Sequence, residues 1–267
     1  AARDLSVTST SATGVQDLWV NGAGAKLSAT HDLSLSASSG QVKLFEGALF
    51  AGNNLSVTAA SLSDVSTTNK TRFAGANNHV ITSGAASIDG GVWGAGGALS
   101  GTFDSLTIGA SGATLYAGTT LSLSAANHLS LATAAVRATG DLTLVATAGT
   151  ISTVGGADQG IQTTAGNLSL NAGNGLSHAG TLSADLGSVT ARIHGTLSNS
   201  GTMYAKTTLD VADKSNGMTG SVTNAGTLIA DGGLIVKAAS VTNQVAGTIQ
   251  GTTGTTLAAH TLINSGT

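Results

Sequence analysis

Short stretches in which apolar and small polar residues alternate recur along the whole chain. Most read Leu, then Ser or Thr, then Leu or Val. The clearest copies lie at 5–7, 33–35, 55–57, 121–123, 142–144 and 168–170, and weaker copies follow at 209–211 and 234–236. A period of two is typical of a half-buried β-strand, and none of these stretches has the spacing of an amphipathic helix. The leading leucines are expected to fill a core: Leu33, Leu55, Leu121, Leu142 and Leu168.

A second phrase dominates the C-terminal third of the chain. It consists of a polar or small residue, Ala or Ser, then Gly, Thr and an aliphatic residue, and its first copy runs from His178 to Leu182. In the fourth copy, Val245 stands at the position of the polar residue. The five glycines of the phrase are Gly180, Gly201, Gly226, Gly247 and Gly266. They step by 21, 25, 21 and 19 residues (201 − 180, 226 − 201, 247 − 226 and 266 − 247). Such a period is the signature of a repeat solenoid.

Together the two phrases predict an all-β fold, a right-handed parallel β-helix with about 20–22 residues per coil, which is a repeat length typical of solenoids. Leu, Ile, Val and Ala would stack inside, while Ser, Thr and Asn form outward ladders. Gly and Asn would form the corners, where we expect positive φ angles. Stacked Asn side chains can also bond to one another along the axis. The chain has no Pro, which fits strands that pair on both edges.

Composition narrows the class of protein. Charged residues make up 9% of the chain and aromatic residues 3%, yet 41% is hydrophobic, which argues against disorder. We therefore expect residues 1–267 to form a single β-helix segment. The N-terminus has no initiator Met and the C-terminus falls inside a repeat, so we expect a piece of a longer filament. The net charge of −3 and the absence of a basic stripe argue against nucleic acid as a partner.

The alternation of Asn-x-Gly-Thr-Leu with Gly-x-Leu-x-Leu resembles the haemagglutinin repeats of filamentous-haemagglutinin-type exoproteins. These are large bacterial proteins secreted by the two-partner route, and they include adhesins and contact-dependent growth inhibition effectors. The resemblance covers the whole chain and is clearest over residues 160–267. It implies a secreted or outer-membrane-associated protein on the surface of a Gram-negative bacterium. The implied partners are the rest of the parent filament, an outer-membrane transporter during export, and a host glycan or cell-surface receptor.

Residues 62–104 break the rhythm, and we expect irregular coils there, with a loop extruded at 64–78. Lys70, Arg72 and Phe73 lie close together in that loop, and Trp93 stands among glycines just beyond it. These four residues are the candidate partner-binding residues, because loops on rigid scaffolds often bind ligands. The alternatives are a tolerated longer corner and a Trp93 that covers the edge of the core. Trp19, in an alternating stretch, is expected to be a core residue or a lateral contact.

The residue pattern does not favour catalysis or a cofactor. The acids are scattered, with Asp210 and Asp213 the closest pair, whereas glycoside cleavage needs two carboxylates at a defined separation. Asp4, Asp32 and Asp141 each precede a Leu phrase, which reads as a corner preference. Calcium nonapeptides need tandem copies, and the chain offers one poor half-match, at 155–158. The six His residues lack ligand spacing. We expect no cofactor, no metal and no catalytic residue.

These observations predict a structural shaft segment of a large secreted surface filament, which presents a distal adhesive or toxic domain. Two alternatives stay open. The segment itself could be an adhesin module that binds a host glycan or receptor through residues 64–97, or, more remotely, a polysaccharide-cleaving β-helix enzyme. An autotransporter passenger would share the same architecture and differ in its export route.

Overall fold

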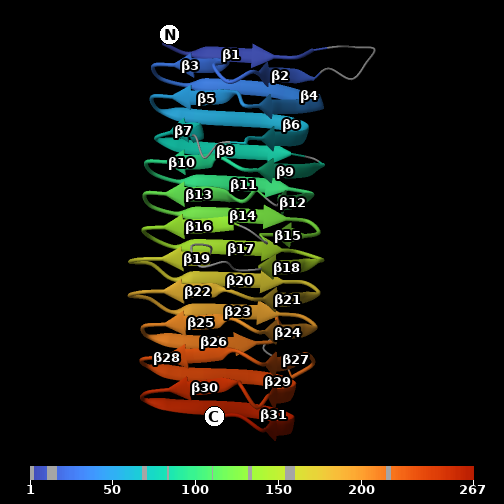
Figure 1. The fold of residues 1–267 in the computed structure, drawn as a ribbon, viewed down its shortest axis with the longest axis vertical. Helices are drawn as coiled ribbons and strands as arrows, with labels where there is room; N and C mark the ends of the chain where they lie inside the picture. Colours follow the sequence, from blue (N-terminus) through green and yellow to red (C-terminus); the bar gives the residue numbers. More distant parts are fainter. Residues whose placement is uncertain are drawn as a thin grey trace.

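The chain winds into a parallel β-helix of about 10 turns, with about 22 residues per turn (Figure 1). The computed structural model describes residues 3–10, 17–67, 71–82, 84–109, 111–131, 134–153, 160–214 and 218–267. These residues form strands β1–β31, and every pairing between strands is parallel apart from one isolated bridge. Among them there is no helix that could cross a lipid bilayer. The prediction of an all-β parallel β-helix is confirmed.

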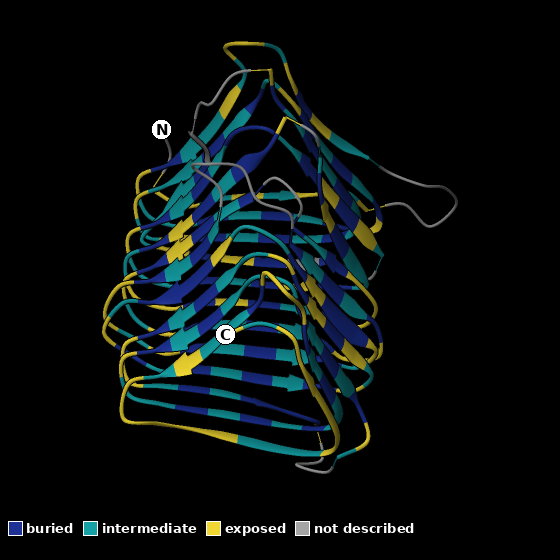
Figure 2. Ribbon diagram, turned by 60° about the horizontal axis from the view of Figure 1, so that its bottom comes forward, coloured by how far each residue is buried: buried dark blue, intermediate teal, exposed yellow. Residues whose placement is uncertain are grey.

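Each coil contributes strands to three faces, which Figure 2 shows as the three sides of the coil stack. The first face consists of β1 (Leu5–Thr8), β8 (Asn77–Thr82), β11 (Leu99–Phe103), β14 (Leu121–Ala125), β17 (Leu142–Ala146), β20 (Leu168–Ala172), β23 (Val189–Ile193) and β26 (Thr208–Ala212). The second face consists of β2 (Leu18–Asn21), β9 (Ala85–Asp89), β12 (Ser105–Ile108), β15 (Leu129–Ser130), β18 (Thr150–Thr153), β21 (Gly175–His178), β24 (Thr196–Asn199) and β27 (Ser221–Asn224). Four long strands run through both of these faces: β4 (Leu33–Phe45), β6 (Asn54–Val65), β29 (Gly233–Asn243) and β31 (Gly254–Asn264).

The third face is a separate sheet of eleven strands. They are β3 (Lys26–Ala29), β5 (Ala48–Ala51), β7 (Thr71–Gly75), β10 (Val92–Ala95), β13 (Ala113–Ala117), β16 (Ala134–Ala138), β19 (Gly160–Thr163), β22 (Thr181–Ala184), β25 (Thr202–Ala205), β28 (Thr227–Ala230) and β30 (Thr248–Gly251). Each strand between the two ends of the stack has a neighbour in the coil before and in the coil after, so its backbone groups bond on both edges. This explains why proline, which lacks the N–H donor, is absent from the chain.

The core is a set of aliphatic columns that run along the axis. On the first face Leu33 pairs with Leu55, and Leu121 pairs with Leu142, which in turn pairs with Leu168. All five leucines are buried, as the sequence predicts. Figure 2 shows the result as buried bands that alternate with less buried ones along the strands. Small polar residues between the leucines face outward and form the expected ladders.

The glycines of the second phrase allow successive coils to approach closely. A Cβ atom on Gly201 would lie 2.3 Å from the carbonyl oxygen of Gly180, and one on Gly226 would lie 2.1 Å from that of Gly201. Either contact is far inside van der Waals range. The expectation that these corners require positive φ holds for Gly180, at 101°, but Gly201, Gly226, Gly247 and Gly266 do not have positive φ angles. The close approach of successive coils, rather than a positive φ angle, therefore explains why glycine occupies most of these positions.

A ladder of asparagines runs along the corner between the second and third faces, and it faces inward, so the prediction that asparagine joins the outward ladders is wrong here. The side-chain N–H of Asn199 donates to Oδ1 of Asn224 at 2.7 Å, Asn224 donates to Asn243 at 2.8 Å, and Asn243 donates to Asn264 at 2.8 Å. Val245 does not occupy this ladder: it is 83% exposed, and Asn243 stands in register with Asn224 and Asn264. The fourth copy of the phrase therefore carries its polar residue two positions earlier than the sequence suggests.

The region 62–104 follows the regular coil in its described part, against expectation. Residues 64–65 end β6, residues 71–75 form β7, and β8 begins at residue 77, so strands rather than an extruded loop occupy most of 64–78. Residues 68–70 lie outside the described part of the chain. One irregularity is present, a register shift between Val92 and Trp93 where β10 pairs with β7. The rhythm of the sequence weakens here because larger and polar side chains replace leucine, while the backbone pairing continues.

The buried columns can be tested with Leu168→Asp. This change places a carboxylate in an apolar interior without a partner, so we expect the free energy of unfolding to fall by about 4 kcal/mol or more. The measurement is urea denaturation followed by circular dichroism. The matched control is Ser169→Asp on the adjacent outward position, where we expect a change within about 1 kcal/mol. Equal stability of the two variants would contradict the assignment of Leu168 to the core.

Candidate functional site

The predicted partner-binding residues do not form a surface. Phe73 and Trp93 are 0% and 1% exposed, so neither aromatic ring is available to a partner, and this part of the prediction is wrong. Lys70 lies outside the described residues, and Arg72 lies in β7 with a side chain that is outside the described part as well. The register explains the burial, because Trp93 pairs with Phe73 on one side and with Leu115 on the other. Phe73 and Trp93 lie about one coil apart in the sequence. This spacing is the signal that could have placed both side chains in one stacked column of the core.

Phe73 and Trp93 instead fill a wide part of the interior. Their ring centres lie 4.0 Å apart with an interplanar angle of 32°. The indole N–H of Trp93 donates to Oδ2 of Asp64 at 2.8 Å, and Asp64 is itself fully buried. A buried indole needs such an acceptor. The arrangement is therefore a packed structural cluster within the coil stack, and it replaces the aliphatic residues found at the same positions elsewhere.

The largest exposed aromatic side chains lie near the N-terminal end, on the second face. Trp19 is 63% exposed and Phe45 is 53% exposed, so Trp19 is not a core residue. Their strands are neighbours: Trp19 pairs with Lys43, and Asn21 pairs with Phe45. Between the two rings lies a surface hollow of about 280 Å³, also lined by Lys43, Asn21 and Ser63. We call this the Trp19–Phe45 hollow. The sequence contains a signal for the two exposed rings. Side chains alternate between inward and outward along a strand, so inward Val20 and Leu44 leave Trp19 and Phe45 facing outward.

Hydrogen bonds and an ion pair hold the Trp19 ring in place. Oδ2 of Asp17 accepts from the Lys43 ammonium at 2.9 Å and from the Trp19 indole N–H at 3.3 Å. Oδ1 of Asp17 accepts from the backbone N–H of Gln41 at 2.9 Å. The Lys43 ammonium also lies 4.6 Å from the centre of the Trp19 ring, a cation–π contact. The hydrogen bond from Lys43 is the largest cause that lowers the pKa of Asp17 to about 2, so this carboxylate stays ionised at neutral pH.

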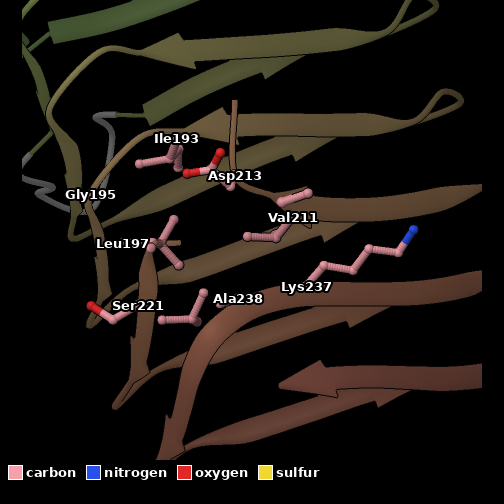
Figure 3. Close-up of a pocket in the computed structure, with 11 residues that line it drawn as sticks. Ile193, Gly195, Leu197, Val211, Asp213, Ser221, Lys237 and Ala238 are labelled. Atoms are coloured by element: carbon pink, nitrogen blue, oxygen red, sulfur yellow. The ribbon is translucent and has the colours of Figure 1, made fainter. Parts of the chain in front are cut away.

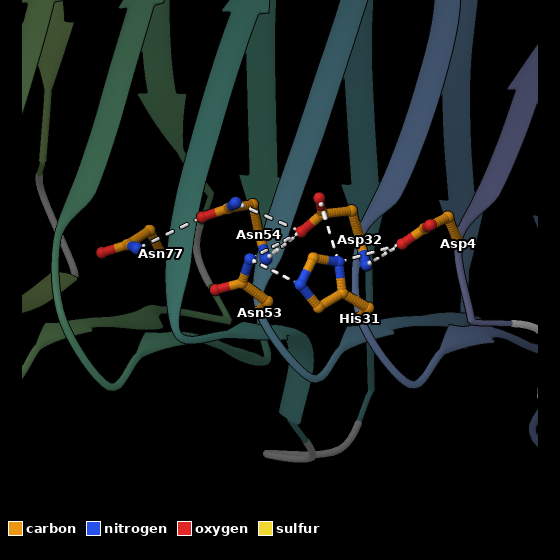
Figure 4. A network of polar contacts seen from close by, with 6 residues as sticks. All are labelled: Asp4, His31, Asp32, Asn53, Asn54 and Asn77. Carbon is orange, nitrogen blue, oxygen red and sulfur yellow. Dashed lines mark hydrogen bonds and ion pairs between the residues drawn. The ribbon is translucent and has the colours of Figure 1, made fainter.

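A second group, Asp4, His31 and Asp32, lies at a corner near the first face (Figure 4). Nδ1 of His31 is 2.9 Å from Oδ1 of Asp4 and 3.2 Å from Oδ2 of Asp32. One candidate ligand atom from each of the three residues lies within 4.8 Å of the other two. Carboxylate oxygens and an imidazole nitrogen are ligands that metals such as zinc accept. The sequence did not single out this combination, because His31 and Asp4 meet only through stacking of coils.

The hydrogen bonds around these carboxylates already explain their positions. Oδ1 of Asp4 accepts from the backbone N–H of Asp32 at 3.2 Å, and Oδ1 of Asp32 accepts from the backbone N–H of Asn54 at 3.0 Å. Asn77 then donates to Oδ1 of Asn54 at 3.2 Å, so the ladder continues along the axis (Figure 4). Chiefly because Asn54 donates to it, the pKa of Asp32 lies below its ordinary value. The network satisfies corner N–H groups, which agrees with the predicted corner preference for Asp.

The acid pair Asp210 and Asp213 does not form a shared site. Asp210 forms an ion pair with Arg192, whereas Asp213 is buried and accepts from the Thr219 hydroxyl at 2.7 Å. Figure 3 shows Asp213 at a small cavity among aliphatic side chains, with Lys237 extending away from it. The cavity measures about 10 Å³, which is room for about one water molecule. The different partners of the two acids and this small volume do not match the paired carboxylates and open cleft of a glycosidase.

His178 is the one ionisable residue in the buried corner ladder, among the residues that the structure describes. It stands in register between Thr153 and Asn199. Its Nε2 lies 3.1 Å from the carbonyl oxygen of Thr202, and since a carbonyl only accepts, Nε2 carries the hydrogen. Nδ1 therefore accepts from the Thr153 hydroxyl, at 2.6 Å. Burial lowers the pKa of the imidazole below its ordinary 6.5, and its hydrogen bonds to backbone carbonyls oppose this shift only in part.

The lowered pKa of His178 predicts a dependence of stability on pH. Because the unfolded chain binds this proton more readily, the stabilisation by neutral His178 is complete above the ordinary pKa of 6.5 and is lost as the pH falls below it. The slope contributed by this one proton is at most about 1.4 kcal/mol per pH unit. We expect His178→Asn, which extends the asparagine ladder, to remove this slope in urea denaturation measured between acidic and neutral pH. His260→Asn, at an exposed position, should keep it; loss of the slope in both variants, or in neither, would contradict the assignment.

Comparison with known proteins does not identify a family for this chain. A scan against protein-family models, a search of curated proteins and a search of solved structures each gave no match. The functional argument therefore rests on the geometry above: a continuous parallel coil stack, satisfied buried polar ladders, and one exposed hollow between two aromatic side chains.

Proposed function

We propose that this β-helix is a shaft segment of a large secreted bacterial surface filament, which holds a distal adhesive or toxic domain away from the producing cell. The supporting observation is the unbroken pairing of strands from coil to coil, most plainly the eleven-strand sheet of the third face. In a solenoid each repeat contacts only its neighbours, so length grows by simple addition. Each coil adds about 4.8 Å, and the paired backbone resists bending.

The resemblance to filamentous-haemagglutinin-type repeats supports the assignment to a secreted filament. The asparagines of the second phrase bond in a ladder from Asn199 to Asn264, so the phrase has a structural role that suits a repeated shaft. In this proposal the segment's partners are the rest of the parent filament and, during export, an outer-membrane transporter. The location would be the surface of a Gram-negative bacterium. The two-partner and autotransporter routes are equally compatible with the coil itself.

The two alternative functions receive less support from the geometry. An adhesin that binds through residues 64–97 would need accessible side chains there, but Phe73 and Trp93 are buried. A polysaccharide-cleaving enzyme would need paired carboxylates in a cleft, whereas Asp210 and Asp213 have separate partners. We therefore propose a mechanical role without catalysis, and the shaft assignment rests on the continuity of the coil.

The shaft proposal can be tested by placing the chain between an outer-membrane anchor and a peptide epitope on the surface of a Gram-negative bacterium. The comparison variant lacks residues 99–141, which are two whole coils because Leu99 pairs with Leu121 and Leu121 pairs with Leu142. We expect the epitope to remain displayed and its height above the membrane to fall by about 10 Å, two strand spacings. Energy transfer between a labelled epitope antibody fragment and a membrane dye measures the height.

The control deletion removes residues 99–109, which contain β11 and β12. We expect this variant to lose the displayed epitope, because β10 and β13 pair in parallel and the few residues left between them are too short for a parallel connection. An epitope height that does not depend on the number of coils would contradict the shaft role.

A further inference from the structure

We propose that the Trp19–Phe45 hollow is a binding site for an uncharged sugar ring of a polysaccharide or glycan. A pyranose ring has an apolar face of C–H groups and a rim of hydroxyls. The hollow offers the complement of both, with aromatic rings on its walls and the polar side chains of Asn21, Lys43 and Ser63 at its edges. Pockets that bind small molecules share this combination of apolar walls and a few placed polar groups.

The aromatic rings are exposed although the fold has a core that could take them. Trp93 and Phe73 show that this coil accommodates large rings in its interior. Trp19 and Phe45 instead stand on outward rows of the second face, 63% and 53% exposed. Outward rows elsewhere carry mostly Ser and Thr, which cost nothing to expose. Two large rings beside one hollow therefore depart from the usual Ser and Thr pattern of the outward rows, and such patches often mark interaction sites.

The Trp19 ring is fixed before any ligand arrives. Its indole N–H donates to Asp17, and the Lys43 ammonium, held by the same carboxylate, lies over the ring. A side chain that is already ordered loses little entropy when it binds, so stacking on it gives a larger net gain. The features that hold Trp19 outward therefore also prepare it as a platform.

Charge argues for an uncharged ligand. Lys43 is the cation that lines the hollow, and the Asp17 carboxylate neutralises it at 2.9 Å. An anionic sugar would have to compete with Asp17 for the ammonium, and a cationic ligand would find no unpaired carboxylate among the lining side chains. Hydroxyl groups can instead hydrogen-bond to the free edges of Asn21 and Ser63 without displacing the ion pair. Binding should accordingly be insensitive to salt.

The size of the patch argues against a protein partner or a second copy of the chain. The exposed parts of the two side chains amount to roughly 230 Å², if each full aromatic side chain is taken as about 200 Å². A stable protein interface needs about 800 Å² on each side. The hollow of about 280 Å³ instead lies near the lower limit of small-molecule pockets, about 300 Å³. A short stretch of sugar rings fits this scale. The site does not rest on the shaft role, because its side chains lie on the outer surface of the coil.

The test uses four oligosaccharide probes with the purified chain: cellotetraose, mannotetraose, the N-acetylglucosamine tetramer, and a heparin tetrasaccharide as the charged comparison. Titration calorimetry and the fluorescence of Trp19, the exposed one of the chain's two tryptophans, report binding. We expect saturable, salt-independent binding of at least one neutral probe. Trp19→Ala and Phe45→Ala should each weaken it by about tenfold or more, as truncation of an aromatic anchor does. The matched control is Tyr116→Ala, an aromatic that is 43% exposed on the third face, and it should leave binding unchanged.

Circular dichroism of each variant shows whether the coil is intact, which we expect because all three side chains are exposed. The proposal is overturned if no neutral probe binds at millimolar concentration, or if binding persists unchanged in Trp19→Ala. Binding of the heparin probe alone, weakened by salt, would overturn it in favour of an anionic ligand. Self-association in sedimentation velocity that Trp19→Ala abolishes would overturn it in favour of a second copy of the chain.

Discussion

The structure depends on one constraint: each residue in a coil lies directly above its equivalent in the previous coil, about one strand spacing away. A side chain must therefore be compatible with a near copy of itself. Leucine meets this condition through apolar contact, as in the column that contains Leu121, Leu142 and Leu168. Serine and threonine meet it through water and neighbouring hydroxyls. Lysine and glutamate do not, because like charges directly opposite repel. The low charged fraction of 9% and the absence of proline are consequences of stacking rather than separate features.

Stacking also decides which polar groups can be buried. An isolated amide in the interior would cost about 1–3 kcal/mol if it lacked a partner. In the ladder, Asn224 donates to Asn243 and accepts from Asn199, so the repeat itself supplies the partners. His178 occupies the same column, and its polar atoms also find partners within the stack. One ring nitrogen accepts from Thr153 and the other donates to a carbonyl. His178 can make both of these hydrogen bonds only in its neutral form. The stability of this corner therefore depends on pH, which it would not do with asparagine at the same position.

The period and the alternation in the sequence were sufficient to predict the fold, because both are direct results of coil stacking. The buried leucines and the bonding between asparagines followed from the same patterns, but the inward direction of the asparagines did not. Individual side chains were harder, since a repeat with small insertions can be aligned in more than one way. By its place in the repeat Val245 matches the asparagine column, although Asn243 fills it, and the glycine neighbours of Trp93 predict a surface position, although Trp93 is buried. The hollow beside Trp19 was missed for another reason: it joins residues from separate coils, and the register that brings Trp19 next to Lys43 was not fixed by the local sequence.

The division between inward and outward positions also determines where this fold can acquire a binding role. Inward positions are bound to their neighbours above and below, so a change there propagates as lost packing. Outward positions contribute little to packing, and a single row can change from serine to tryptophan without altering the coil. Trp19 and Lys43 are neighbours on such a row, and their contact with Asp17 is complete within two coils. A mechanical shaft and a ligand site are therefore not competing descriptions of one molecule. The backbone ladder serves the first, and a local substitution on the outer face is enough for the second.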